Sequence, residues 1–188
     1  MKTRTLALLG ALVFTAQAQA IVVLGTTAGG ATWTRPVAGN PPTPPVSGVG
    51  VGVNYTVIPF TVSAAGSYVF QSTATSPLNW DNYTFLYQTS FNPASQFTNV
   101  LIGNDDNPSI GLSGFSYALN TGTTYFLITT GFATGDAGAY SDSITGPGNV
   151  NVVPEPAAFG LMAGLSSLPI STLVNCEAGL NEVWYKKV

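Results

Sequence analysis

The side chains with the clearest potential for chemistry are carboxylates and amides that gather in one short segment. Asp105 and Asp106 are flanked by Asn104 and Asn107 in a stretch whose composition predicts a loop. Calcium takes roughly six to eight oxygen ligands, which Asp and Asn side chains and loop carbonyls can supply. The alternative is structural, because Asp and Asn also dominate turns by hydrogen bonding to their own backbone. No EF-hand ligand spacing is present, so both interpretations stay open.

Catalysis through histidine is excluded, because the 188-residue chain contains no histidine. Ser-His-Asp and Cys-His catalysis and the zinc sites that contain histidine all need that residue. Two of the aspartates could instead act as acid and base of a glycoside hydrolase, held about 5 to 10 Å apart in a carbohydrate cleft. We favour this alternative least, because a small domain with its acids on mobile loops offers little pocket. We expect the chain not to be an enzyme.

Aromatic residues make up 11% of the chain and raise the question of sugar binding. Trp80, Tyr83 and Tyr87, with Tyr125 and Tyr140 as further candidates, could form a flat face on which sugar rings stack. Together with the acidic loop, such a face would make the chain a calcium-assisted carbohydrate-binding module. Alternating aromatic residues are more often core residues or cross-strand pairs. The binding module therefore predicts exposed rings, and buried rings would count against it.

Charged residues are rare, at 7% of the chain, with five Lys and Arg against eight Asp and Glu. A typical soluble domain is about a quarter charged. Four of the five cations lie near the chain ends, which excludes nucleic-acid binding through a basic patch. The single cysteine, Cys176, excludes an intrachain disulfide framework. Residues 21–153 hold one cation, Arg35, and five acids, so their net charge is −4 and their surface must consist mainly of uncharged polar residues.

The elements that must position these residues are short strands. Apolar and polar residues alternate with the period of two that is typical of strands, and Gly, Asn, Asp and Pro mark the turns. Pro59 suggests an edge position for its strand. The fold class predicted over residues 53–146 is all-β, an antiparallel two-sheet, jelly-roll-like β-sandwich, with a β-barrel as the alternative. The expected strands are 55–62, 67–73, 83–88, 100–103, 115–119, 124–130 and 140–145.

Part of this series resembles the bacterial pre-peptidase C-terminal domain, a small β-sandwich found appended to secreted proteins. The resemblance covers roughly residues 55–146 and rests on four elements in order: 60–62 with 66–70, 80–87, 103–107 and 119–127. It implies the sandwich fold. Members of that family can bind calcium in this region, so the resemblance also implies Asp81, Asp105 and Asp106 as calcium ligands.

The N-terminal segment has the three-part pattern of a secretory signal peptide, expected over residues 1–20. A basic start and an apolar run lead to a small-residue cleavage site at Ala18 and Ala20. The apolar run is too short to cross a bilayer about 30 Å thick, and a buried N-terminal helix is the alternative. The mature chain would begin at Ile21. A Gly- and Pro-rich lead-in over 21–52 is expected to be semi-rigid, although its first residues could pair as an edge strand.

A linker is expected over residues 147–153, and it leads into the sequence Val153-Pro154-Glu155-Pro156 and an apolar run. This order resembles the PEP-CTERM sorting signal, in which Val-Pro-Glu-Pro, an apolar membrane segment and a basic cluster follow one another. The resemblance implies a Gram-negative bacterial host and export. It also implies recognition and cleavage at this motif by an exosortase-type membrane protease or transpeptidase.

The tail over residues 154–188 supports this assignment in part and departs from it after about residue 165. Residues 157–176 carry no charge over 20 positions, about the length of a membrane-spanning C-terminal helix, and two lysines near the end would stop transfer. However, several Ser and Thr residues dilute the run, and Pro169 would kink a spanning helix. A reading-frame shift after about residue 165 is one explanation of the departure.

These observations predict an exported protein of the cell surface or extracellular space that the C-terminal segment anchors transiently in the inner membrane. Proteins with this sorting signal accompany exopolysaccharide production. The leading hypothesis is therefore a structural or adhesive role in matrix or biofilm. Polysaccharide is a candidate partner, and Ca²⁺ is the candidate cofactor.

Overall fold

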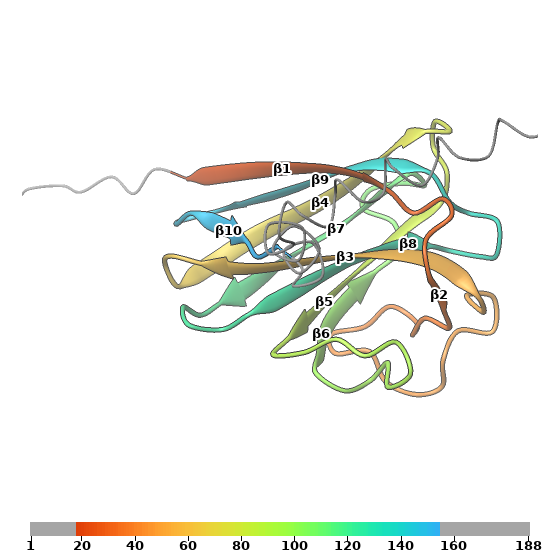
Figure 1. Ribbon diagram of the computed structural model, residues 1–188, viewed down its shortest axis with the longest axis horizontal. Helices are drawn as coiled ribbons and strands as arrows, with labels where there is room; N and C mark the ends of the chain where they lie inside the picture. Colours follow the sequence, from red (N-terminus) through yellow and green to blue (C-terminus); the bar gives the residue numbers. More distant parts are fainter. Residues whose placement is uncertain (1–17, 155–188) are drawn as a thin grey trace, which may run out of the picture. The chain divides into compact units, whose positions relative to one another are not determined.

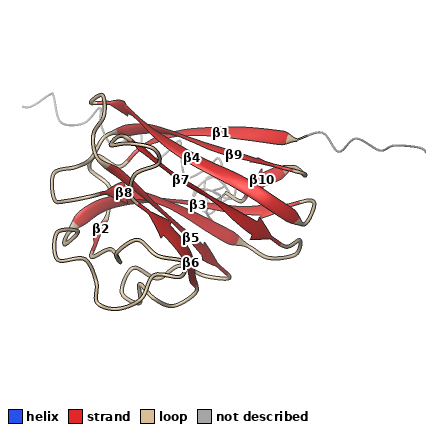
Figure 2. Ribbon diagram, turned by 180° about the vertical axis from the view of Figure 1, so that it is seen from behind, coloured by secondary structure: helices blue, strands red, loops and turns tan. Residues whose placement is uncertain are grey.

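The computed structural model describes residues 18–154, which form ten strands and no helix (Figure 1, Figure 2). All strand pairs are antiparallel, and they build two sheets that face one another, so the predicted all-β sandwich is confirmed. No helix that could cross a membrane is present in this range. The signal peptide up to residue 17 and the sorting tail from Glu155 onward lie outside the described residues.

The first sheet has four strands in the order β1-β9-β4-β7, with bounds Gln19–Thr26, Ala139–Gly146, Gly66–Ser76 and Leu112–Leu119. The second sheet has six strands, in the order β10-β3-β8-β5-β6 with β2 paired to the beginning of β3. Their bounds are Val150–Val152 for β10, Val53–Val62 for β3, Tyr125–Gly131 for β8, Asn82–Gln88 for β5, Val100–Asn104 for β6 and Thr32–Trp33 for β2.

The main hydrophobic core lies between the two sheets. Along β9 every second residue is buried, as expected for a strand that presents one face to the core. The register places Phe60 opposite Tyr125 in the second sheet and Phe70 opposite Phe115 in the first. The rings of Phe60 and Phe70 lie 6.0 Å apart and join the sheets. Each such side chain contributes roughly 1.5–3 kcal/mol through burial.

A second hydrophobic cluster lies on the opposite face of β5, which is buried on both sides. Tyr83, Phe85 and Tyr87 share this face, and the preceding segment covers them with Trp33. The Trp33 ring meets Phe85 edge-on at 5.6 Å, and its Nε1 donates a hydrogen bond to Thr130 Oγ1 at 3.0 Å. The segment predicted as a lead-in, residues 21–52, is thus part of the folded domain. Buried side chains such as Trp33 attach it to the sheet, although the segment lacks strand periodicity.

Strands β1 and β10 extend the two sheets beyond the predicted limits of 53–146. β1 pairs with β9 along its whole length, from Gln19 opposite Gly146 to Thr26 opposite Ala139, so the edge strand considered for this segment is present. β10 lies in the range expected as a linker and pairs with the end of β3. Pro59 lies on β3 between the stretches that pair with β2 and β10, where no strand covers the outer edge in the described residues.

A layer of six polar side chains crosses the interior between the sheets; its members are Ser72, Asn82, Thr84, Ser113, Thr129 and Asp142. Thr129 Oγ1 donates to Asp142 Oδ2 at 2.6 Å, and Asn82 Nδ2 donates to Ser72 Oγ at 2.9 Å. The hydroxyls of Thr84 and Ser113 meet across the sheets at 2.7 Å. Burial raises the pKa of Asp142 to about 6, although hydrogen bonds from Ser72 and Thr129 oppose the shift. This acid therefore keeps its proton more readily in the folded chain.

Candidate functional site

The structure brings the three predicted ligands Asp81, Asp105 and Asp106 together at one end of the second sheet. Asp81 immediately precedes β5, and the other two immediately follow β6. Because β5 and β6 pair antiparallel, with Thr84 opposite Asn104, the start of one strand lies beside the end of the other. One carboxylate oxygen from each acid lies within 4.8 Å of the others. We call this group the acid cluster.

Like charges in the acid cluster are only partly compensated. Burial, together with the neighbouring Asp81 and Asp106, raises the pKa of Asp105 to about 6, while Arg35 opposes the shift. Burial also raises the pKa of Asp81, again with Asp106 as a contributor and Arg35 in opposition. The Oδ1 atoms of Asp81 and Asp105 are buried and make no hydrogen bond within the described residues. Such oxygens are costly to bury without a partner.

The composition of the acid cluster fits a hard divalent cation. All of its ligand atoms are carboxylate oxygens, which calcium prefers, and Asp81 and Asp105 each have one buried oxygen with no hydrogen-bond partner among the described residues. With one oxygen from each, three carboxylates provide fewer ligands than calcium takes, so further carboxylate oxygens, backbone carbonyls or water would complete its shell. The chemistry of the donors therefore fits calcium.

The two amides that flank the acid cluster have a different role from the one considered in the sequence. Asn104 Oδ1 accepts from the backbone N–H of Gly114 at 3.3 Å, and Asn107 Nδ2 donates to the carbonyl of the same residue at 3.1 Å. Both side chains are thus bound to β7, the outer strand of the first sheet. They fasten the acidic loop to that strand.

Arg35 is a neighbour of the acid cluster that the sequence did not predict. Its side chain is fully buried and is the sole cation between residues 18 and 154. The Nη2 group donates to the carbonyl of Phe132 at 2.7 Å, Nε donates to that of Gly131 at 3.1 Å, and the guanidinium lies 4.0 Å from the centre of the Tyr83 ring. Its positive charge acts to lower the pKa of Asp81 and of Asp105, although no ion pair joins it to either acid among the described residues. No motif around residue 35 signals this burial.

The predicted sugar-stacking rings are buried, so the prediction of an exposed aromatic strip is wrong. Trp80 packs in the core between the sheets and donates from Nε1 to the carbonyl of Ala139 at 2.8 Å. Tyr83 and Tyr87 lie in the cluster that the segment around Trp33 covers. Tyr125 and Tyr140 are buried too. For Tyr83 and Tyr87 the physical reason is that β5 is an inner strand with cover on both faces, whereas the other three rings belong to the core between the sheets.

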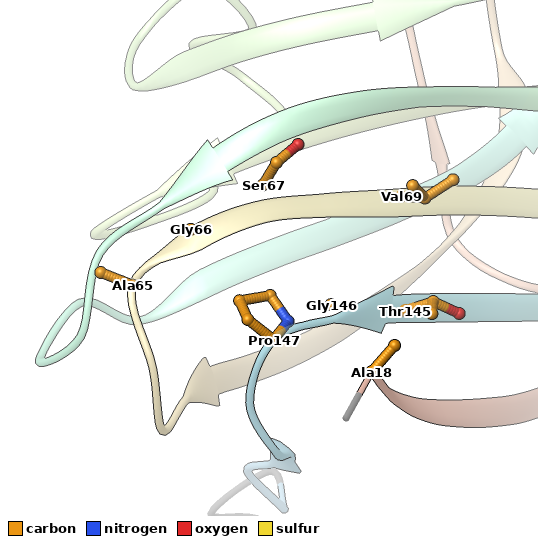
Figure 3. A pocket seen from close by; sticks show the side chains of 8 residues that line it. All are labelled: Ala18, Ala65, Gly66, Ser67, Val69, Thr145, Gly146 and Pro147. Atoms are coloured by element: carbon orange, nitrogen blue, oxygen red, sulfur yellow. The ribbon is translucent and has the colours of Figure 1, made fainter. Parts of the chain in front are cut away.

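The predicted processing residues lie at the two ends of the described chain. Ala20 lies in β1, whereas Val153 and Pro154 follow β10 and are exposed. Glu155 and Pro156 are outside the described residues. A surface groove of about 530 Å³ lies at the beginning of β1 (Figure 3). It is lined only by small and uncharged residues: Ala18, Ala65, Gly66, Ser67, Val69, Thr145, Gly146 and Pro147.

The fold and the site define an all-β sandwich with an acid cluster beside a buried arginine. No protein-family model and no curated protein matches the chain. Among solved structures, it is similar to the K3 cleaved adhesin domain of Lys-gingipain from Porphyromonas gingivalis, with a TM-score of 0.35 and 16% sequence identity. That match covers 69% of this chain and 73% of the adhesin domain. No functional conclusion rests on a similarity of this extent.

Proposed function

We propose that this chain is an exported protein of the bacterial cell surface or extracellular matrix with a structural or adhesive role. An exosortase-type membrane protease or transpeptidase would sort it. The observation that carries the proposal is that the folded domain lies between the two segments predicted to be processing signals. β1 begins at Gln19, inside the predicted cleavage site, and β10 ends at Val152, next to the sorting motif. Cleavage at both signals would leave every strand in place, with β1 shortened by at most two residues.

The distribution of charge also supports a role outside the cell. Six charged residues lie between residues 18 and 154, and Asp106 alone among them is exposed. Arg35 and Asp142 are fully buried, and the remaining acids are half-buried. The surface therefore offers neutral polar groups, which suit contacts with polysaccharide or with neighbouring proteins better than ion pairing does.

We further propose that the acid cluster holds a calcium ion in the exported protein. The specific support is the convergence of three carboxylates with two buried oxygens that make no hydrogen bond in the described chain. A cation there would offset both the burial and the repulsion from Asp81 and Asp106 that raise the pKa of Asp105. It would tie the start of β5 to the end of β6 and so stabilise the loops at this end of the sandwich.

Cell fractionation tests the sorting proposal. The sorting motif is replaced in the triple variant P154A/E155A/P156A, and the double variant N120A/T121A, in an exposed turn, serves as the control. We expect the wild-type chain and the control at the cell surface or in the medium, and the motif variant in the inner-membrane fraction, because it is not cleaved. Equal distribution of all three chains would contradict exosortase-type sorting.

A further inference from the structure

Three of the four sheet edges are covered by other segments or side chains of the same chain. On β6, Gly103 exchanges two backbone hydrogen bonds with Gly39, of 2.8 and 3.0 Å. On β7, the side chains of Asn104 and Asn107 occupy the N–H and the carbonyl of Gly114. The outer edge of β3 carries the short strands β2 and β10 with Pro59 between them. Natural sheets protect their edges in such ways because an open edge is a template for another strand.

The fourth edge, β1, has none of this protection. It is eight residues long and contains no charge and no proline, and no described residue pairs with its outer side. Its outward side chains include Val22, which is 60% exposed, and Leu24, which is 76% exposed. In Figure 1 it is the outermost strand of its layer. Lys or Pro at this position would be the usual means of preventing pairing.

We propose that a second copy of this chain pairs with β1, strand against strand and antiparallel. The alternation of side chains allows only registers in which residues of the same face meet. With the two-fold axis at Val23, Val22 of one copy lies opposite Leu24 of the other, and the exposed aliphatic side chains of both copies cluster on one face. On the other face, the half-buried side chains of Ile21 and Val23 pack against the core and would lie along the line where the two copies meet.

The sequence of β1 favours a second copy over an unrelated peptide as the occupant. The centre of the strand is complementary to itself in this register, because Val22 meets Leu24 on one face and Val23 meets Val23 on the other, while Ile21 lies opposite Gly25. No exposed charge on β1 opposes the contact: the strand has no charged residue, the acid cluster lies at β5 and β6 in the other sheet, and Asp142, opposite Val23 on β9, is buried. A two-fold contact of this kind closes on itself, so the product is a dimer and not a fibre. This inference rests on β1 and not on the proposed surface role.

Sedimentation velocity of the full chain purified from producing cells, with its ends defined by intact mass, tests the proposal. We expect a monomer–dimer equilibrium between about 1 µM and about 300 µM, the range for an interface of strand size. Leu24→Lys should raise the dimer Kd on the order of 100-fold, because it replaces the leucine that meets Val22 of the other copy by a charge at two symmetric positions. Leu78→Lys is the control, since Leu78 is 78% exposed in the turn that follows β4 and is not part of β1.

Hydrogen exchange keeps the proposal testable if the lysine variant does not fold. Backbone amides of residues 21–25 in the wild-type chain should exchange more slowly at high than at low protein concentration, while those of β7 should not change. A chain that stays monomeric over the whole range, with exchange in β1 independent of concentration, would overturn the proposal. So would a dimer that Leu24→Lys does not weaken.

Discussion

The buried carboxyl of Asp142 should make the folded domain more stable in mild acid than at neutral pH. Its side chain is fully buried, and its pKa rises from an ordinary value of 3.8 to about 6. The folded state therefore binds a proton more tightly than the unfolded state. By linkage, this contribution to stability is fully present below about pH 3.8 and is lost as the pH rises through about 6. The difference corresponds to about 3 kcal/mol.

Asp142→Asn isolates this contribution, because asparagine has nearly the same shape and carries no charge. Its side-chain oxygen can still accept the hydrogen bond from Thr129. At about pH 4 the variant should match the wild type, whereas at pH 7 and above it should be more stable by up to about 3 kcal/mol. The assay is urea unfolding from pH 4 to 8 in the presence of a chelator, which excludes any contribution from bound metal.

The exposed acid Asp106 provides the control for this prediction. Asp106→Asn, at the exposed acid, should keep the pH dependence that comes from Asp142. If the stability difference between the wild type and Asp142→Asn is the same at pH 4 and at pH 8, the carboxyl does not hold its proton in the folded state. The raised pKa of Asp142 would then be refuted.

Three further predictions concern the acid cluster and the segment that covers β5. Removing calcium with a chelator should lower the melting temperature of the wild-type chain; the loss of stability is about 2.7 kcal/mol if the free calcium concentration was 100 times the Kd. Asp105→Asn should abolish the difference between the melting temperatures with and without calcium. An unchanged melting temperature of the wild-type chain would contradict the calcium site. Arg35→Met should destabilise the domain by about 2–4 kcal/mol in urea unfolding, because it leaves the carbonyls of Gly131 and Phe132 without their donor; an effect below about 0.5 kcal/mol would argue against this anchor. Trp33→Ala should cost about 3–5 kcal/mol by opening the second cluster, and hydrogen exchange should increase in residues 34–52 before it increases in β9.

The alternation of residues made the strands of the sandwich predictable. Period two is visible wherever one face is buried and the other is not, as in β4 and β9. It also placed the acids correctly, because Asp81 and Asp105 adjoin strands that the pattern identified. What remained open was which strands are neighbours, since pairing depends on contacts far apart in the sequence.

The cover over β5 could not be predicted in the same way. Residues 27–52 are rich in Gly and Pro and show no periodicity, so nothing local indicates that Trp33 and Arg35 are buried. The prediction for Tyr83 and Tyr87 was wrong for the same reason, because their face looks solvent-exposed until this segment covers it. The polar layer around Asp142 was equally hidden, since Ser, Thr and Asn in a strand usually indicate a surface position.

Intact mass of the protein recovered from the surface or medium of its native host tests the central proposal most directly. A chain with two processed ends should begin at or near Ile21 and end near Pro156, so that it contains the two sheets and little else. A chain that retains Met1 would contradict export through a cleaved signal peptide. A chain that extends to Val188 would contradict sorting by cleavage at the Val-Pro-Glu-Pro motif.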